Sequence, residues 1–168
     1  KDVAFSIPVW SLGDGFVVYQ GNPKVLTSYQ AVAKNSNARL GVIPGQVQFD
    51  AAKKAGLGES QLVIFNNQPD AVAALLAGKI DAFAATAVGN RAIVKANPTL
   101  EAIPLENKKD GKSPVGAFSF SKSNHTLLQA MNTQLYQYIG SADHRARMAK
   151  YGITKTEIDS VVPDKGTQ

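Results

Sequence analysis

The sequence of 168 residues contains no cysteine, which excludes a disulfide framework, a thiolate metal site and a cysteine nucleophile. It also has no apolar run that approaches the roughly 20 residues of a transmembrane helix. Its 18 basic and 13 acidic residues give a net charge of +5, but the basic residues are dispersed along the chain. A nucleic-acid interface needs a basic patch interleaved with aromatic side chains, so no nucleic-acid partner is expected.

Residues that usually carry catalysis or hold a cofactor are also scarce. The two histidines, His125 and His144, lie in separate polar segments without partners at metal-ligand spacing. Gly13-Asp14-Gly15 and Gly56-Leu57-Gly58 each lack the third glycine of a dinucleotide-binding fingerprint. No Gly-x-Ser-x-Gly nucleophile elbow occurs. We therefore expect no enzyme activity, no catalytic residue, no cofactor and no bound metal.

Strand and helix patterns alternate through the first two thirds of the chain. Short apolar runs predict strands at 16–19, 39–43, 62–65, 80–84 and 100–103. Helical patterns between them predict helices at 28–34, 47–55, 70–77 and 88–96. This order is typical of βαβ units and predicts an α/β fold with a mostly parallel sheet flanked by helices.

The last third of the chain has a different pattern. A polar, lysine-rich segment at 106–114 predicts a loop, and Val115–Phe120 predicts a further strand. Helices are expected over about 123–139 and 143–151, and a last one from Thr154.

Two places combine features suited to ligand binding. In Ile43-Pro44-Gly45-Gln46-Val47-Gln48, a strand is followed by the start of a helix, whose unpaired N–H groups can hold a carboxylate without a cationic side chain. Thr86 follows the fourth expected strand, and ligands of open α/β sheets bind beyond the carboxyl ends of strands. A plain Pro-Gly turn and a helix cap, respectively, explain the same residues.

Six segments occur in a characteristic order along the whole chain. They are Phe5-Ser6-Ile7-Pro8-Val9-Trp10, Gly15–Tyr19, Arg39–Val47, Gly78-Lys79-Ile80-Asp81-Ala82, Pro114-Val115-Gly116-Ala117 and the helical region from Leu127 to Tyr151. In this order they resemble the family 3 extracellular solute-binding proteins, the polar amino-acid and opine-type receptors of bacterial ABC importers. The resemblance implies a periplasmic-binding fold of type II, in which two α/β lobes, joined by two crossover strands, hold a ligand between them.

The resemblance also implies how the chain divides. Residues 17–115 would form one complete ligand-binding lobe, and residues 1–16 and 116–168 would be the hinge and parts of a partial second lobe. The N-terminal part of that second lobe, with the family's ligand-clamping arginine, would be absent from the chain. The flanking segments would then expose an apolar stripe, so self-association of the chain is expected. The stripe consists of Leu127, Leu128, Met131, Leu135 and Tyr138.

Two departures from the family pattern bear on the ligand. Thr86 stands where the family has an aspartate that pairs with an α-ammonium group, and Gln46 replaces a loop threonine. Both changes disfavour an ordinary α-amino acid, because a neutral side chain cannot offset an ammonium charge. Segments around Pro8–Gly15 and Gln46-Val47-Gln48 are most similar to ectoine and hydroxyectoine receptors. The delocalised cation of such ligands suits an aromatic face, and Trp10 is the only tryptophan, although ordinary packing explains it equally well.

We therefore expect a periplasmic, or otherwise extracytoplasmic, solute-binding protein for a small zwitterionic solute such as ectoine or a polar amino-acid derivative. Its partner would be the membrane permease of an ABC importer. The alternatives are a ligand-sensing domain of a receptor or kinase and an enzyme of the same fold that resembles cyclohexadienyl dehydratase. The expected ligand-binding residues are Trp10, Gly45, Gln46, Val47 and Thr86.

Overall fold

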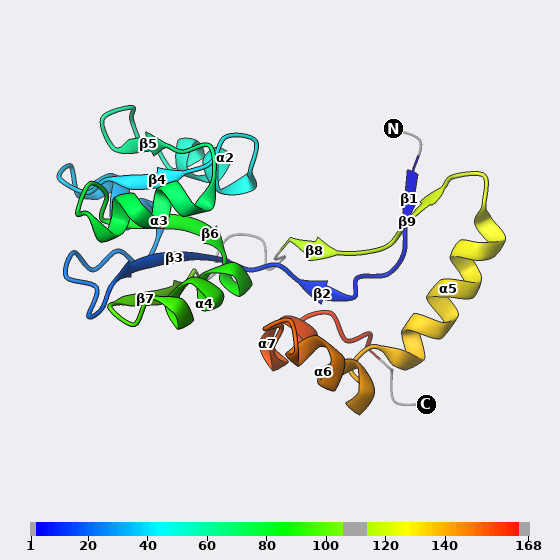
Figure 1. Cartoon of the computed structure of the whole chain (residues 1–168). Helices are drawn as coiled ribbons and strands as arrows, with labels where there is room; N and C mark the ends of the chain where they lie inside the picture. Colours follow the sequence, from blue (N-terminus) through cyan, green and yellow to red (C-terminus); the bar gives the residue numbers. More distant parts are fainter. Residues whose placement is uncertain (1–2, 106–113, 165–168) are drawn as a thin grey trace. The chain divides into compact units, whose positions relative to one another are not determined.

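The computed structural model describes residues 3–105 and 114–164 and divides into two compact units (Figure 1). Unit 1 comprises residues 1–12 and 112–168, and unit 2 comprises residues 13–111. The assignment of 17–115 as a complete lobe stays a prediction. The loop expected at 106–114 lies, apart from Pro114, outside the described residues.

Unit 2 contains a five-stranded sheet with the order β5-β4-β6-β3-β7. Its strands are β3 (Asp14–Tyr19), β4 (Leu40–Val42), β5 (Leu62–Ile64), β6 (Ala82–Thr86) and β7 (Leu100–Pro104). Strand β4 runs parallel to β5 and β6, whereas β3 runs antiparallel to β6 and β7. Strands β4, β5, β6 and β7 therefore share one direction, which confirms the α/β class. The antiparallel strand β3 makes the sheet mixed. A buried apolar run indicates a strand but not its direction.

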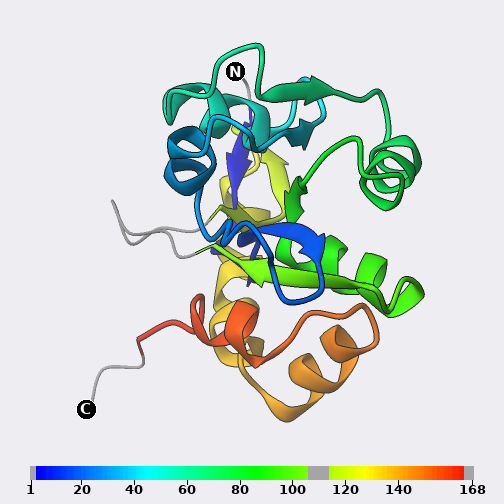
Figure 2. The same cartoon turned by 90° about the vertical axis from the view of Figure 1, so that its left-hand side faces the viewer.

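Two helices cover each face of this sheet (Figure 2). Helices α1 (Tyr29–Lys34) and α2 (Val47–Lys54) lie on one face, and α3 (Gln68–Leu76) and α4 (Ala87–Ala96) lie on the other. Capping side chains start three of them: Ser28, Asn67 and Thr86 each accept a hydrogen bond from a backbone N–H in the first turn.

Alternation along the strands determines which side chains reach each helix layer. Phe16 and Val18 of β3 pack into the core under α1 and α2, and Val17 packs into the core under α3 and α4. Ala84 and Phe83 divide in the same way in β6. Successive strand residues point to opposite faces, so Asp14 and Thr86 continue the series that faces α1 and α2.

Unit 1 has short strands and three helices. Strand β1 (Val3–Phe5) pairs with β9 (Ser119–Ser121), and β2 (Trp10–Ser11) pairs with β8 (Val115–Gly116), both antiparallel. The helices are α5 (His125–Tyr138), α6 (Ala142–Ala149) and α7 (Lys155–Asp159).

The single strand expected at 115–120 is therefore wrong, because the structure has two short strands in two separate sheets. The opposite segment contains Pro8, which lacks an N–H group and cannot continue the ladder between β1 and β2.

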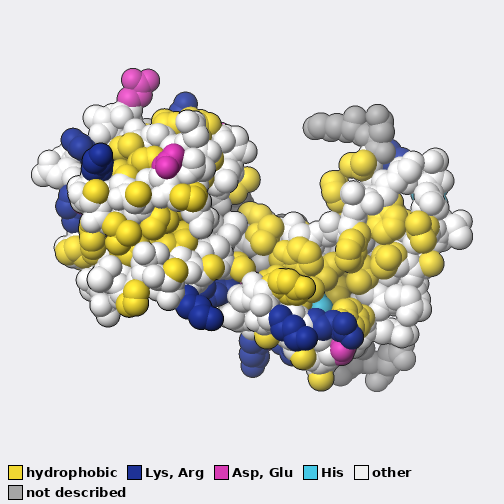
Figure 3. Space-filling view, viewed as in Figure 1, with side chains coloured by type: hydrophobic (Ala, Val, Ile, Leu, Met, Phe, Trp, Pro, Cys, Tyr) yellow, Lys and Arg dark blue, Asp and Glu magenta, His cyan; other side chains and the backbone are white. Residues whose placement is uncertain are grey.

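The core of unit 1 is small. Val9, Leu135 and Ile139 are buried, with Trp10 and Met131 among the residues packed against them. Several large apolar side chains remain exposed, and yellow side chains cover much of this unit in Figure 3. The exposed large apolar side chains of this unit include Val3, Phe5, Val115, Phe118 and Leu127. Across the described residues, no helix is long and apolar enough to cross a membrane.

Candidate functional site

One edge of the unit 2 sheet brings together most of the residues expected to bind a ligand. Strands β4 and β6 end at this edge, and their antiparallel neighbour β3 begins there. The turn at Gly45, Gln46 and Val47 follows β4, and Thr86 ends β6. Ligands of open α/β sheets bind beyond such strand ends. Trp10 belongs to unit 1 and is described separately.

The turn after β4 presents its residues to solvent. The Gln46 N–H donates to the carbonyl oxygen of Ile43 at 3.3 Å, and Gly45 has a φ of +79°, which glycine adopts readily. Gly45, Gln46 and Val47 are all exposed. The side chain of Gln46 does not cap α2, so it leaves the first N–H groups of that helix to other acceptors. The ligand contacts of these three residues stay a prediction.

Thr86 has a structural role in the absence of any ligand. Its Oγ1 accepts a hydrogen bond from the Gly89 N–H at 3.1 Å and so caps α4. The hydroxyl hydrogen is still available for donation to a ligand or to water. The expected ligand contact of Thr86 stays a prediction alongside this cap.

Asp14 and Gln48 belong to the same edge. Neither is among the five residues expected to bind the ligand, although Gln48 ends the segment Ile43–Gln48 that the sequence indicated. Asp14 is the direct cross-strand partner of Thr86, and its Oδ1 accepts a 2.8 Å hydrogen bond from Nε2 of Gln48. Gln48 is only 2% exposed, and it is the second residue of α2. The spacing of Asp14 from Phe16 could have identified it, because residues two apart in a strand share a face.

Burial gives Asp14 unusual electrostatics. Partial removal from water raises the pKa of Asp14, and the hydrogen bond from Gln48 opposes this shift. No lysine or arginine among the described residues forms an ion pair with Asp14. The carboxylate is therefore partly desolvated and has one amide as its side-chain partner.

Tyr29 adds a second unusual group near this edge. Its ring packs edge-on against Phe16, with ring centroids 5.1 Å apart. Its hydroxyl oxygen is buried and has no hydrogen-bond partner within the described part of the chain. Burial first, and the charge of Asp14 second, raise the pKa of Tyr29. The hydroxyl therefore stays protonated, and it carries an unused donor within electrostatic reach of Asp14.

Trp10 packs inside unit 1. It lies opposite Gly116 in the register of β2 and β8, and it contacts the core around Val9 and Leu135. A Cβ atom added to Gly116 would lie only 2.5 Å from Cε2 of Trp10, so the indole ring lies directly over this glycine. Packing therefore accounts for the position of Trp10, and its ligand contact stays a prediction.

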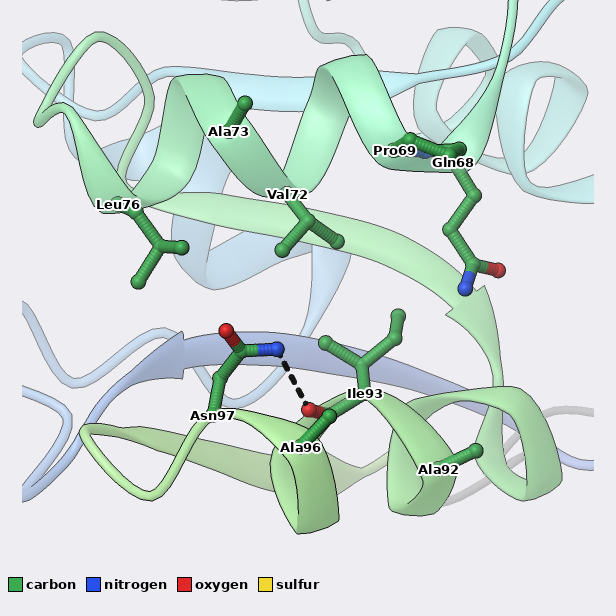
Figure 4. A pocket seen from close by; sticks show the side chains of 9 residues that line it. All are labelled: Gln68, Pro69, Val72, Ala73, Leu76, Ala92, Ile93, Ala96 and Asn97. Atoms are coloured by element: carbon green, nitrogen blue, oxygen red, sulfur yellow. Dashed lines mark hydrogen bonds between the residues drawn. The ribbon is translucent and has the colours of Figure 1, made fainter.

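A separate groove lies between α3 and α4, on the other face of the sheet from Asp14 (Figure 4). Its volume is about 430 Å³, and none of the expected ligand-binding residues lines it. The two polar lining residues are Gln68 and Asn97, and the Asn97 amide already donates to the Ile93 carbonyl oxygen. Without a charged side chain, this groove is poorly suited to a zwitterion. Its lining residues are Gln68, Pro69, Val72, Ala73, Leu76, Ala92, Ile93, Ala96 and Asn97.

The fold of unit 2 is that of a lobe of the periplasmic-binding type II class. No protein-family model matches the chain. The whole chain is 29% identical, over 172 aligned residues, to the probable amino-acid ABC transporter periplasmic-binding protein y4tE of Sinorhizobium fredii. This match confirms the resemblance to solute-binding proteins of ABC importers that the sequence motifs indicated.

Solved structures agree with this class. EhuB in complex with hydroxyectoine is 25% identical with a TM-score of 0.69, and the match covers 97% of this chain and 65% of EhuB. The substrate-binding protein AbpA of Streptococcus pneumoniae, bound to L-arginine, is 21% identical with a TM-score of 0.70, over 92% of this chain and 64% of AbpA. The chain spans 56% of the length of the Sinorhizobium protein.

Proposed function

We propose that the chain is part of an extracytoplasmic solute-binding protein that presents a small zwitterionic solute to the membrane permease of an ABC importer. The observation that carries this proposal is the polar edge of the unit 2 sheet. An exposed turn leads there into the start of α2, and the partly buried carboxylate of Asp14 lies against the same helix. The edge thus offers N–H groups for the carboxylate of a zwitterion and a negative charge for its cation.

The names of the relatives support this assignment. The Sinorhizobium protein is named as a probable amino-acid receptor, EhuB was solved with hydroxyectoine, and AbpA was solved with L-arginine. All three ligand classes pair a carboxylate with a positively charged group. We propose a solute of this kind, such as ectoine or a polar amino-acid derivative, with contacts from Gly45, Gln46, Val47, Thr86 and Trp10.

Titration calorimetry on the protein, in the full length that its gene encodes, tests the proposal. The ligands are ectoine, hydroxyectoine, L-arginine and L-glutamine, and glucose is an uncharged control. We expect at least one zwitterion to bind with micromolar or tighter affinity and glucose not to bind. Failure of all four zwitterions would overturn the proposed function.

We further propose that the protein binds its solute without converting it. The proposal is motivated by the absence from the sequence of a nucleophile elbow, a cofactor fingerprint and metal-ligand spacing. Pure protein is incubated with prephenate or arogenate, and the products are followed by chromatography. Reproducible turnover would support the enzyme alternative instead.

We also propose that the chain of 168 residues associates with itself through unit 1. Phe5 is 63% exposed, Leu127 is 49% exposed and Phe118 is 46% exposed, and large apolar surfaces tend to find partners. Leu135 is buried, so the exposed surface is smaller than the stripe expected from the sequence. Light scattering at low micromolar concentration should give a mass above that of a monomer, and a clean monomer would contradict this proposal.

A further inference from the structure

We propose that Asp14 is the specificity-determining residue that receives the positively charged group of the solute. This inference rests on the proposed function and deepens it, because it names the group that distinguishes a zwitterion from a simple organic anion. The observation behind it is a carboxylate that is held partly out of water at the ligand-binding edge without a cationic partner among the described residues.

The strand register places the negative charge of Asp14 beside Thr86, which is neutral. Asp14 and Thr86 are directly opposed on neighbouring antiparallel strands, so their Cβ atoms are about 5 Å apart. Both side chains belong to the series that faces α1 and α2. A neutral residue at the end of β6 is therefore accompanied by a carboxylate from the start of β3, and the edge keeps a negative charge.

Helix α2 connects this carboxylate to the turn at Gly45. Gln48, which donates to Asp14, directly follows Val47 at the start of the helix. Gln48 thus links the carboxylate of Asp14 to the N–H groups at the start of α2. A small zwitterion can place its carboxylate on these N–H groups and its cation on Asp14.

The surroundings of Asp14 favour a cation from outside the protein. A partly desolvated carboxylate gains more from a positively charged partner than an exposed one does, because the local dielectric is low. Gln48 donates only to Oδ1 of Asp14, so Oδ2 is available for a positively charged group.

Asp14→Asn is the decisive variant, because asparagine has the same shape and can still hydrogen-bond to Gln48. Calorimetry on the protein in its full encoded length, with hydroxyectoine and L-arginine as probes, should show a loss of affinity of about tenfold or more for the solute that binds. The matched control is Glu59→Gln, which removes an exposed carboxylate from a turn that contributes nothing to the proposed site. This control should leave the affinity unchanged.

A second variant separates recognition from positioning. Gln48→Met removes the hydrogen bond to Asp14 but keeps the side-chain volume and the negative charge. If Asp14 served only to anchor α2, Gln48→Met would weaken binding at least as much as Asp14→Asn, which keeps this hydrogen bond, and that result would overturn the inference. We expect Gln48→Met to have the smaller effect on affinity.

The outcomes distinguish this inference from the function on which it rests. If the unaltered protein binds none of the zwitterions, the proposed function is wrong and the role of Asp14 is wrong with it. If the unaltered protein binds a zwitterion and Asp14→Asn binds it equally well, only the role of Asp14 is wrong. A selective loss in Asp14→Asn, with normal thermal melting, supports both.

Discussion

Replacement of Gly116 by alanine should disturb Trp10 and destabilise unit 1. The new Cβ would lie 2.5, 2.6 and 2.7 Å from Cε2, Nε1 and Cζ2 of the indole, which are ring atoms that cannot move independently. The whole side chain of Trp10 must therefore shift, which disturbs its packing against Val9 and Leu135. Overpacking of this kind costs about 1–3 kcal/mol of the free energy of unfolding.

The assay uses Trp10 itself, because it is the only tryptophan of the chain and its fluorescence reports on unit 1. In urea titrations, Gly116→Ala should lower the unfolding midpoint by about 1 M and shift the native emission maximum. Gly58→Ala is the control, because its new Cβ would meet no atom closer than 4.0 Å. An unchanged midpoint and an unchanged emission maximum in Gly116→Ala would refute the packing that we assign to Trp10.

Two further changes test the turn at Gly45 and the buried His144. Gly45→Val should weaken solute binding more than Gln46→Ala in calorimetry, because φ is +79° at Gly45 and a left-handed backbone costs an L-residue about 1–2 kcal/mol; equal effects would contradict this. Burial first, and Arg145 second, lower the pKa of His144 below 6.5, with Asp143 opposing. The unfolded state therefore binds more protons, and the urea midpoint should fall as pH drops from about 7.5 to about 5.5. His144→Gln should remove this slope, and a slope that persists in it would show that other groups cause it.

The sequence predicted the elements of unit 2 well because their signals are local. Apolar runs identified β4, β5 and β6, and the helix expected at 28–34 corresponds to α1, which Ser28 caps. The antiparallel direction of β3 was not predictable in this way, because direction depends on where the chain enters the sheet. The two short ladders of unit 1 were also missed, since the interruption comes from Pro8 in a partner strand more than a hundred residues away.

The residues of the candidate site were predicted only where their signal is local in the sequence. Glycine-rich turns and strand ends are visible in a sequence, so Gly45 and Thr86 could be selected without a structure. The partnership of Asp14 with Gln48 spans 34 residues, and that of Asp14 with Thr86 depends on the register of two strands. A charged residue two positions before a buried phenylalanine was the available signal, and it indicates an inward-facing carboxylate.

The last prediction concerns the segment Gly78-Lys79-Ile80-Asp81-Ala82. It tests whether Asp81 in this motif stabilises the fold or binds the solute. Oδ2 of Asp81 accepts a 2.8 Å hydrogen bond from the Arg39 N–H, and Oδ1 forms a 2.8 Å ion pair with Lys24. Asp81→Ala should therefore lower the free energy of unfolding by about 2 kcal/mol, mainly through the hydrogen bond, because ion pairs this accessible contribute about 1 kcal/mol or less.

Asp81 lies about 16 Å along β6 from Thr86, so solute affinity should be unchanged in the same variant. Urea denaturation and calorimetry on one preparation measure both quantities. The matched control is Lys24→Met, which removes the ion pair and the Lys24 hydrogen bond to the Asn37 carbonyl oxygen but leaves the bond between Asp81 and the Arg39 N–H. A loss of affinity in Asp81→Ala without a loss of stability would show that the motif binds solute. A loss of stability without a loss of affinity would mean that Asp81 fastens the residues before β6 to those before β4. The motif would then serve the fold rather than the ligand.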